Sequence, residues 1–387
     1  MMRHAGLGVF FLSLTLAAAA PVPVQARDAK PDRGANAAMK YWQAFGLLPT
    51  LDKKQVEFLQ RWNKVPIAGA ARKLIDSSSM SRLYLHRAAQ LPHCDWNLNY
   101  EDGIRLVLPH IAKARTLGFL AALHARQAFE QGRWKAGARD VADLLKMARH
   151  LKSDRTIFSH LVGYLIELTA IEAAAPYLPK LKDVLPGAVS PVLEAPGGAT
   201  LAQMVRLEKQ IGAQWLIREL KSAEKRKKGG WQAVWKEIID IPDEGGGGSN
   251  RAAAKAAKTF KQAIDLLEDL LPRYDELAKL AALPWKEFDA QYPKFFKKAK
   301  ADNPLAGFFF PAMDKVAAAQ RRNQAHRALF QAALAVVEGG PDKLKDIKDP
   351  FGKGPFKYRA LDKGFELKAK LLYRGKPIVL VVGQGKP

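Results

Sequence analysis

The sequence predicts a mainly α fold, an irregular helical bundle followed by a small C-terminal antiparallel β-meander. Apolar side chains recur at spacings of three and four residues over much of residues 36–338, which indicates amphipathic helices. Clusters of proline and glycine, such as those between residues 176 and 198, separate these periodic segments. The last 37 residues change to short β-type runs joined by turns, which predicts strands rather than helices.

Three helical segments are expected first. Residues 36–48 form a helix with Met39, Trp42, Phe45 and Leu47 in the core, and residues 51–62 form a second helix. A helix over residues 68–91 is interrupted or capped at the serines 77–79, and the HCDW stretch at residues 93–96 comes next as a loop.

Residues 111–131 and 134–151 then predict a helical hairpin. The turn FEQGRW (residues 129–134) and the small residues 136–138 resemble a tetratricopeptide hairpin, but no 34-residue repeat follows, so one TPR-like hairpin is expected. Residues 157–175 are apolar on nearly every side, which suits a central helix of a soluble core.

The second half predicts longer helices and a tail of strands. Thr200 is the expected N-cap of a helix over residues 201–227, and residues 231–239 form a short helix. Two long helices, beginning near residues 260 and 308, are expected to pair antiparallel through the connecting residues 284–304. The predicted strands cover residues 356–361, 365–373 and 378–382, with the last and most apolar strand internal to the sheet.

These elements suggest a division of the chain. The predicted parts are a signal peptide (1–26), a helical bundle domain (27–242), a glycine-rich linker (243–250), a long-helix hairpin (251–340) and a β-meander (341–387). The signal peptide rests on an uncharged apolar run of 16 residues and on V-Q-A before a cleavage expected after Ala26. The alternative, an N-terminal membrane anchor, needs about 20 apolar residues. We therefore expect export to the periplasm or the cell exterior.

Three stretches together carry a family resemblance. They are NAAMKYWQAF (36–45), CDW (94–96) with LPH (108–110), and DPFGKGPFKY (349–358). The chain resembles a family of uncharacterised exported bacterial proteins that have a signal peptide, a helical body and a short β tail, and this resemblance implies no particular activity. The DPFxGxP tail also resembles the C-terminal module of type II secretion pseudopilins, but the prepilin cleavage motif is missing, so assembly into a pilus is not expected.

The densest polar cluster is His93, Cys94 and Asp95, with His110 further along the chain. A thiol, imidazoles and a carboxylate in one region could form a Cys–His nucleophile pair or a metal site. The competing interpretation is structural: Cys94 and Trp96 fill the core between helices while Asp95 caps a turn. His110, His124, His150 and His160 could converge from consecutive helices, but buried or surface structural histidines are the alternative.

The sequence lacks the motifs of the common catalytic and cofactor sites. The single cysteine excludes an internal disulfide framework, a cysteine-rich zinc domain and c-type haem attachment. No G-x-S-x-G and no P-loop occur, because the glycines 245–248 lack the Lys-Ser/Thr that would come after them. No cofactor and no metal ion are therefore expected.

Charge is the global feature that needs an explanation. The chain has 62 Lys+Arg against 38 Asp+Glu, and residues 251–387 alone carry 27 basic against 15 acidic side chains. Lys294, Lys297, Lys298 and Lys300 cluster beside Tyr292, Phe295 and Phe296, and the tail adds seven further cations: Lys353, Lys357, Arg359, Lys363, Lys368, Lys370 and Arg374. Basic residues among aromatics could bind a polyanion or an anionic membrane surface, although a merely solvated surface is the alternative.

The sequence supports two functions. The first is a non-enzymatic exported structural or interaction protein, whose basic surface binds an anionic membrane, an acidic polymer or an acidic protein; export argues against genomic nucleic acid. The alternative is a periplasmic or secreted hydrolase with a site near His93, Cys94, Asp95 and His110. An enzyme requires these groups to converge in a concave pocket, whereas a binding module requires a continuous basic face.

Overall fold

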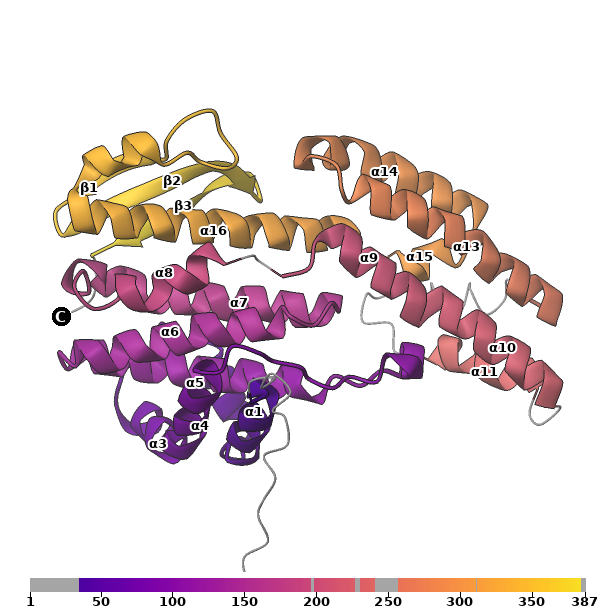
Figure 1. The fold of residues 1–387 in the computed structure, drawn as a ribbon, viewed down its shortest axis with the longest axis horizontal. Helices are drawn as coiled ribbons and strands as arrows, with labels where there is room; N and C mark the ends of the chain where they lie inside the picture. The colour runs from indigo at the N-terminus through magenta and orange to yellow at the C-terminus, as the bar shows by residue number, and fades with distance from the viewer. Residues whose placement is uncertain (1–34, 196–197, 227–229, 241–256, 311, 384–387) are drawn as a thin grey trace, which may run out of the picture. The chain divides into compact units, whose positions relative to one another are not determined.

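The computed structural model describes residues 35–195, 198–226, 230–240, 257–310 and 312–383 (Figure 1). The predicted signal peptide (1–26) and the predicted linker (243–250) lie outside these residues. Within them the fold is mainly α-helical, with one three-stranded antiparallel sheet near the C-terminus. The predicted fold class is confirmed.

Four helices come first, and the first two of them begin at side chains that cap them. They are α1 (Ala37–Gly46), α2 (Lys53–Leu59), α3 (Gly69–Ser77) and α4 (Ser79–Ala89). The Asn36 side chain accepts a hydrogen bond from the backbone of α1, and Asp52 forms a capping box with Gln55 at the start of α2. Ser78 separates α3 from α4, so the predicted interruption is confirmed.

The predicted core face of α1 is partly wrong. Met39 and Leu47 are 63% and 43% exposed, whereas Tyr41 and Phe45 are buried. The buried stripe of α1 runs through Ala37, Tyr41 and Ala44, and this stripe is turned away from Met39. Alanines therefore form much of the contact surface, and their small side chains give little hydrophobic signal in the sequence.

Helices α5 (Pro109–Glu130) and α6 (Trp134–Leu151) form the predicted hairpin, and both pack on α7 (Ile157–Ala174). The rings of Phe129 and Trp134 stack at 6.2 Å across the turn. A Cβ atom on Gly137 would lie 2.4 Å from the Phe129 ring, so only glycine permits this close approach.

Among the described residues, only the segment Ile157–Lys180 is long and apolar enough to cross a bilayer, and 61% of its most apolar window is buried inside the protein.

After α7 the chain continues through η2 (Ala175–Lys180) and α8 (Pro186–Glu194) to a long interrupted helix. The predicted helix over residues 201–227 consists of α9 (Leu201–Lys209), a π-helical turn η3 (Gln210–Gln214) and α10 (Trp215–Arg226), with Thr200 as N-cap. A π turn adds a residue and so rotates the remainder of the helix about its axis. The Trp215 indole, directly after the turn, donates to the Glu101 carbonyl (2.7 Å). Helix α11 (Gly230–Asp240) comes next.

The two long helices do not form the antiparallel pair that the sequence suggested. Helix α13 (Phe260–Leu280) packs mainly against α9 and α14 (Trp285–Asp302), while α16 (Met313–Gly339) packs mainly against α7 and the sheet (Figure 1). The predicted connector is itself the helix α14, and the short α15 (Ala306–Phe309) precedes α16. Amphipathic periodicity marks a helix and its apolar face, but it does not identify the partner helix.

The C-terminal strands are β1 (Lys357–Leu361), β2 (Gly364–Tyr373) and β3 (Lys376–Val382), after the short η4 (Pro341–Asp346). The sheet order is β1-β2-β3, so β2 is central and the prediction of an internal last strand is wrong. Strand β3 is apolar because its inner side chains pack on α16, while the Gly383 N–H beside its end donates to the Ala175 carbonyl (3.1 Å). Burial of one face can explain an apolar edge strand.

Buried side chains gather in two hydrophobic clusters. One contains residues from 37–193 together with 325–382, and the other contains residues from 201–235 together with 257–317. Helix α16 contributes its first part to the second cluster and its later part to the first. This helix therefore positions side chains of both halves, including those of the groove described below.

Candidate functional sites

Residues 93–96 lie in a loop that is fixed to the start of α1. The Asn36 side-chain amide donates to the Asp95 carbonyl (2.7 Å), and the Asp95 N–H donates to Asn36 Oδ1 (2.9 Å). The Ala37 N–H donates to the His93 carbonyl (2.8 Å). The Asp95 carboxylate accepts from the Asn97 N–H (2.9 Å), which is the geometry of an Asx turn. Asp95 thus caps a turn.

Cys94 and Trp96 point from this loop into the core. Cys94 is 6% exposed, and the Trp96 Nε1–H donates to the His150 carbonyl (3.0 Å) while its rings stack on Phe45. Burial, and then the neighbouring Asp95 charge, raise the pKa of the Cys94 thiol to about 12. A thiol in this state is not the thiolate that nucleophilic catalysis requires.

His110 is brought to the other side of the same indole. It lies at the start of α5, is fully buried, and stacks on Trp96 with ring centroids 4.5 Å apart. Neither ring nitrogen has a hydrogen-bond partner among the described residues, and the nearest carboxylate oxygen, Asp154 Oδ2, is 4.0 Å from Nε2. Burial lowers the pKa of His110 to about 4, although Asp154 opposes this shift. The imidazole is therefore neutral at pH 7.

A cavity of about 350 Å³ adjoins the loop. Its lining includes His93, Cys94 and Asp95 from the predicted set, but not His110, and adds three residues that sequence reasoning did not place there: His150, Ser153 and Asp154. These three stand close together at the end of α6, more than 50 positions away along the chain. Predicting them would require knowing which loop packs on the end of α6, and no pattern in the sequence indicates that loop.

The added polar groups are already used in structural hydrogen bonds. The Ser153 hydroxyl hydrogen-bonds the carbonyls of Cys94 (2.9 Å) and His150 (2.8 Å). The Asp154 carboxylate accepts from the Tyr100 hydroxyl (3.0 Å) and from the Thr156 N–H (2.7 Å). No serine or cysteine of this described cavity is paired with a base that could activate it. The arrangement fastens the loop to the ends of α6 and α7.

The other predicted histidines have separate partners. The His124 ring nitrogen Nδ1 lies 2.5 Å from the Asp140 carboxylate, and the His150 Nδ1 lies 2.8 Å from the Tyr41 hydroxyl. His160 is bonded on both nitrogens, to backbone atoms near its own helix and near residue 199. Within the described ranges no group of three or more His, Cys, Asp or Glu side chains could hold a metal ion.

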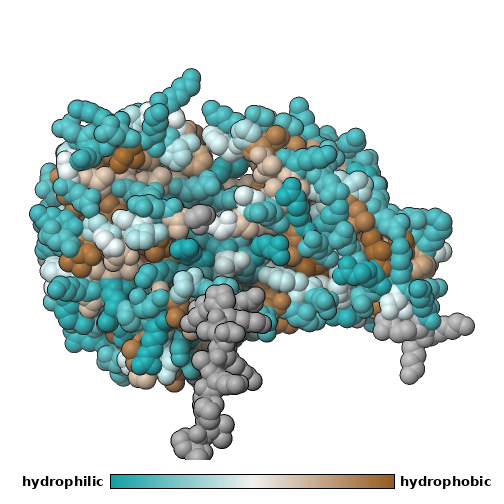
Figure 2. All heavy atoms as spheres, viewed as in Figure 1, coloured by the Kyte–Doolittle hydropathy of each residue, from teal (hydrophilic) through white to brown (hydrophobic). Residues whose placement is uncertain are grey.

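The four predicted polyanion-binding lysines lie on α14. Lys294, Lys297, Lys298 and Lys300 are all exposed, and none of them forms an ion pair within the described part of the chain. At 100° per residue they cover an arc of about 160° that faces away from the buried side of the helix. Hydrophilic side chains also cover most of the face seen in Figure 2.

Two of the three aromatic residues beside these lysines do not reach the surface, whereas the third, Phe296, is half-buried. Tyr292 and Phe295 are 4% and 8% exposed, and the Tyr292 hydroxyl donates to the Phe310 carbonyl (3.1 Å). Because helical spacing places these two rings on the core side of α14, the predicted interleaving of aromatics and cations at one surface is wrong for Tyr292 and Phe295. The lysines and part of Phe296 remain available to an anionic partner.

Two cations of the sheet, Arg359 and Lys368, share an acidic neighbour. Glu366 accepts from Arg359 (2.9 Å) across β1 and β2, and it lies 3.8 Å from the Lys368 ammonium. The exposed face of α14 is therefore the clearer positive surface of the C-terminal region.

Comparison of the chain with family models, curated proteins and solved structures finds no match. The functional argument therefore rests on the chemistry of the described residues.

Proposed function

We propose that this chain is an exported, non-enzymatic interaction protein that binds anionic components of the cell envelope through its basic surface. The observation that carries the proposal is the solvent face of α14, where Lys294, Lys297, Lys298 and Lys300 are exposed and have no acidic partner among the described residues. Lysines close to an anionic membrane contribute on the order of 1 kcal/mol each.

The hydrolase alternative receives less support. The loop cavity does bring His93, Cys94 and Asp95 together. However, the raised pKa of Cys94 and the lowered pKa of His110, both caused mainly by burial, describe a neutral thiol and a neutral imidazole. Neither group is paired with the other. We therefore assign this loop a structural role, in which it joins the start of α1 to the end of α6.

The test is the binding of the full mature chain to vesicles. Vesicles containing phosphatidylglycerol should bind the protein, and vesicles of phosphatidylcholine alone should not. Binding should weaken steeply between about 0.01 M and 0.15 M salt, since the Debye length falls from about 30 Å to about 8 Å. An acidic polysaccharide serves as a second anionic surface in the same assay.

Replacing Lys294, Lys297, Lys298 and Lys300 together with Gln should weaken vesicle binding at least tenfold. A matched control replaces four exposed lysines on other elements, which removes the same total charge from scattered positions: Lys53, Lys113, Lys135 and Lys182. The control should bind much like the wild type. Equal losses in the two variants would show that net charge alone attracts the protein. No binding at low salt would contradict the proposal altogether.

A further inference from the structure

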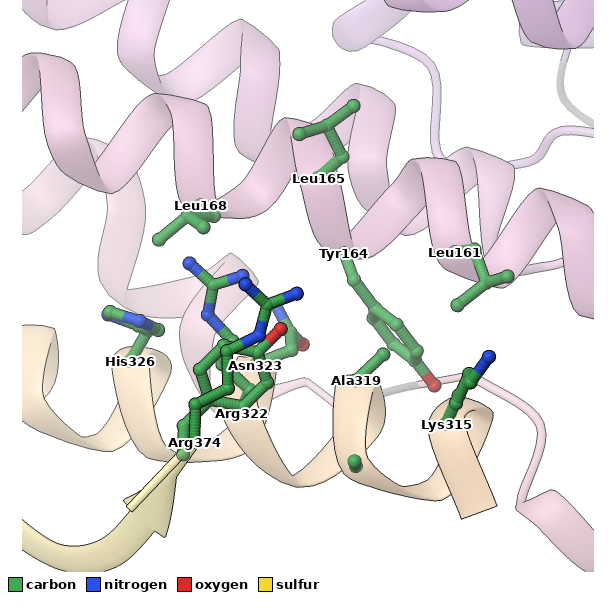
Figure 3. Close-up of a pocket in the computed structure, with 12 residues that line it drawn as sticks. Leu161, Tyr164, Leu165, Leu168, Lys315, Ala319, Arg322, Asn323, His326 and Arg374 are labelled. Atoms are coloured by element: carbon green, nitrogen blue, oxygen red, sulfur yellow. The ribbon is translucent and has the colours of Figure 1, made fainter. Parts of the chain in front are cut away.

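A groove between α7 and α16, bordered by the β2–β3 turn, is unrelated to either predicted site. Its volume is about 440 Å³, within the range of small-molecule binding sites. Figure 3 shows side chains of α7 facing those of α16 across it, with Arg374 reaching in from the turn.

One wall of the groove is apolar. Leu161, Leu165 and Leu168 form a stripe on α7 at helical spacing, and all three are half-buried rather than covered. Phe158 continues the same stripe toward the start of α7 and is 60% exposed. The stripe from Phe158 to Leu168 is about 15 Å long. Ala318 and Ala319 on α16 leave the opposite wall open.

Three cations line the same groove: Lys315, Arg322 and Arg374. The guanidinium carbons of Arg322 and Arg374 lie 4.8 Å and 5.5 Å from the centroid of one ring, that of Tyr373. Both guanidinium groups therefore lie against one ring, and in the view of Figure 3 they appear below the leucines of α7. Two like charges held at one ring repel each other, so an anion bound by both would relieve an unfavourable arrangement.

Neither of two nearby acidic groups forms an ion pair with these cations. Glu167 is engaged by Lys152 (2.5 Å) and lies 3.6 Å from Arg327. Glu172 lies within electrostatic range of Arg322, but its carboxylate accepts from Asn63 (3.3 Å). No ion pair to Lys315, Arg322 or Arg374 occurs among the residues that the structure describes.

The backbone of the β2–β3 turn beside the groove is strained. Arg374 adopts φ +51, in the left-handed region that asparagine and glycine tolerate best. Arg374 and Gly375 form the two-residue turn between β2 and β3, and asparagine is the residue most favoured before the glycine of such a turn. An arginine held there places its guanidinium beside that of Arg322, and strain of this kind often accompanies a functional site.

Two buried polar atoms on the α16 wall have no partner among the described residues. The Asn323 side chain is 7% exposed, and its Nδ2 donor makes no hydrogen bond with them. The Nδ1 atom of His326, one turn further, is also without a partner there. Burial and the Arg322 charge lower the pKa of His326 to about 4, so this ring is neutral at pH 7. Unsatisfied buried donors are rare and call for a ligand.

We propose that this groove binds a single long-chain carboxylate, with its head group between Arg322 and Arg374 and its hydrocarbon chain along Leu165 and Leu161 toward Phe158. The planar guanidinium fork matches a carboxylate in bidentate geometry. The Asn323 amide supplies a further donor at the head-group end. The site is independent of the lysines on α14.

The test is calorimetric titration of the mature protein with dodecanoate below its micelle concentration. Dodecanoate should bind, whereas dodecanol lacks the charge and acetate lacks the chain, so both should bind at least tenfold more weakly. Dodecyltrimethylammonium should not bind. The proposal is overturned if dodecanol binds as tightly as dodecanoate, or if the titration with dodecanoate shows no binding.

The variant Arg322→Gln/Arg374→Asn should weaken dodecanoate binding at least tenfold. The single variant Arg374→Asn places in the turn a residue that favours positive φ, so it should fold even if the double variant does not. It should also lose affinity for dodecanoate. Lys297→Gln/Lys298→Gln on α14 is the matched control and should bind dodecanoate like the wild type.

The outcome also separates this site from the function proposed above. Unchanged affinity in Arg374→Asn overturns the groove proposal. If free dodecanoate does not bind, but anionic vesicles bind the wild type and not the Arg374→Asn variant, the groove is a membrane-docking surface and the carboxylate site is wrong. If vesicle binding depends only on the α14 lysines, the groove plays no part in it, and dodecanoate binding tests the groove by itself.

Discussion

Replacing His110 with phenylalanine should reduce the sensitivity of this protein to acid. His110 is fully buried, stacks on Trp96 at 4.5 Å, and has no hydrogen-bond partner for either ring nitrogen among the described residues. Burial lowers its pKa from 6.5 to about 4. The unfolded chain therefore binds a proton below pH 6.5 that the folded protein does not bind until about pH 4.

Over that window the free energy of unfolding falls as the pH falls. A shift of about 2.5 pKa units corresponds to at most about 3 kcal/mol, lost between pH 6.5 and pH 4. His150 and His326, whose pKa values burial also lowers to about 4, act in the same direction. Asp143 acts in the opposite direction, because burial raises its pKa to about 6 and its contribution to stability is lost as the pH rises through 6.

The difference between wild type and His110→Phe isolates the contribution of this one residue. At pH 7 the variant should be as stable as the wild type or more stable, since two unsatisfied buried nitrogens, which cost about 1–3 kcal/mol, are removed. Between pH 7 and pH 4 its free energy of unfolding should fall less, by up to about 3 kcal/mol. Urea unfolding followed by tryptophan fluorescence at several pH values measures both quantities.

His93 provides the matched control, because it is exposed in the neighbouring loop. His93→Phe should retain the acid sensitivity of the wild type. The reasoning fails if His110→Phe and the wild type lose stability in parallel as the pH falls, since His110 would then not be held neutral in the folded state.

Three further predictions concern the core. Cys94 should resist a thiol reagent at pH 8 in the native protein and react once the chain is unfolded, because burial raises its pKa to about 12; rapid native labelling would contradict this. Gly103→Ala should lower stability by about 3 kcal/mol, since φ is +59 and the new Cβ would lie 2.1 Å from an indole ring. Gly132→Ala, with positive φ but open space, should cost about 1 kcal/mol, and equal melting temperatures for the two variants would refute the steric argument. Lys152→Met should cost about 3 kcal/mol by leaving the buried Glu167 short of its partner, and Lys152→Met with Glu167→Leu should recover most of that loss; a harmless single variant would show that the pair is not tightly coupled.

The positions of most helices and of all three strands can be predicted from local signals in the sequence. Asn36, Asp52 and Thr200 cap the helices that begin after them, as their side chains can bond the free N–H groups of a first helical turn. The break at Ser78 and the loop before Trp96 are likewise marked by residues that leave helical geometry readily. These signals act over a few positions, so a single sequence contains them.

The structure decided which faces and which helices meet. Met39 and Leu47 are exposed although they are apolar, while the alanines of α1 are buried. Helix α16 packs on α7 rather than on α13, and β3 is an edge strand although it is the most apolar. Packing depends on the combined shape and volume of elements far apart in the chain, and hydrophobic periodicity describes only one element at a time.

The candidate sites divide in the same way. The exposed lysines of α14 could be predicted from the sequence, because charged side chains stay in water; the burial of Tyr292 and Phe295 beside them required the helix to have a partner. The groove that holds Arg322 and Arg374 left no mark in the sequence. It exists because a helix and a strand turn, each with ordinary local spacing, converge on a third element, α7, and only the tertiary structure brings two guanidinium groups to one aromatic ring.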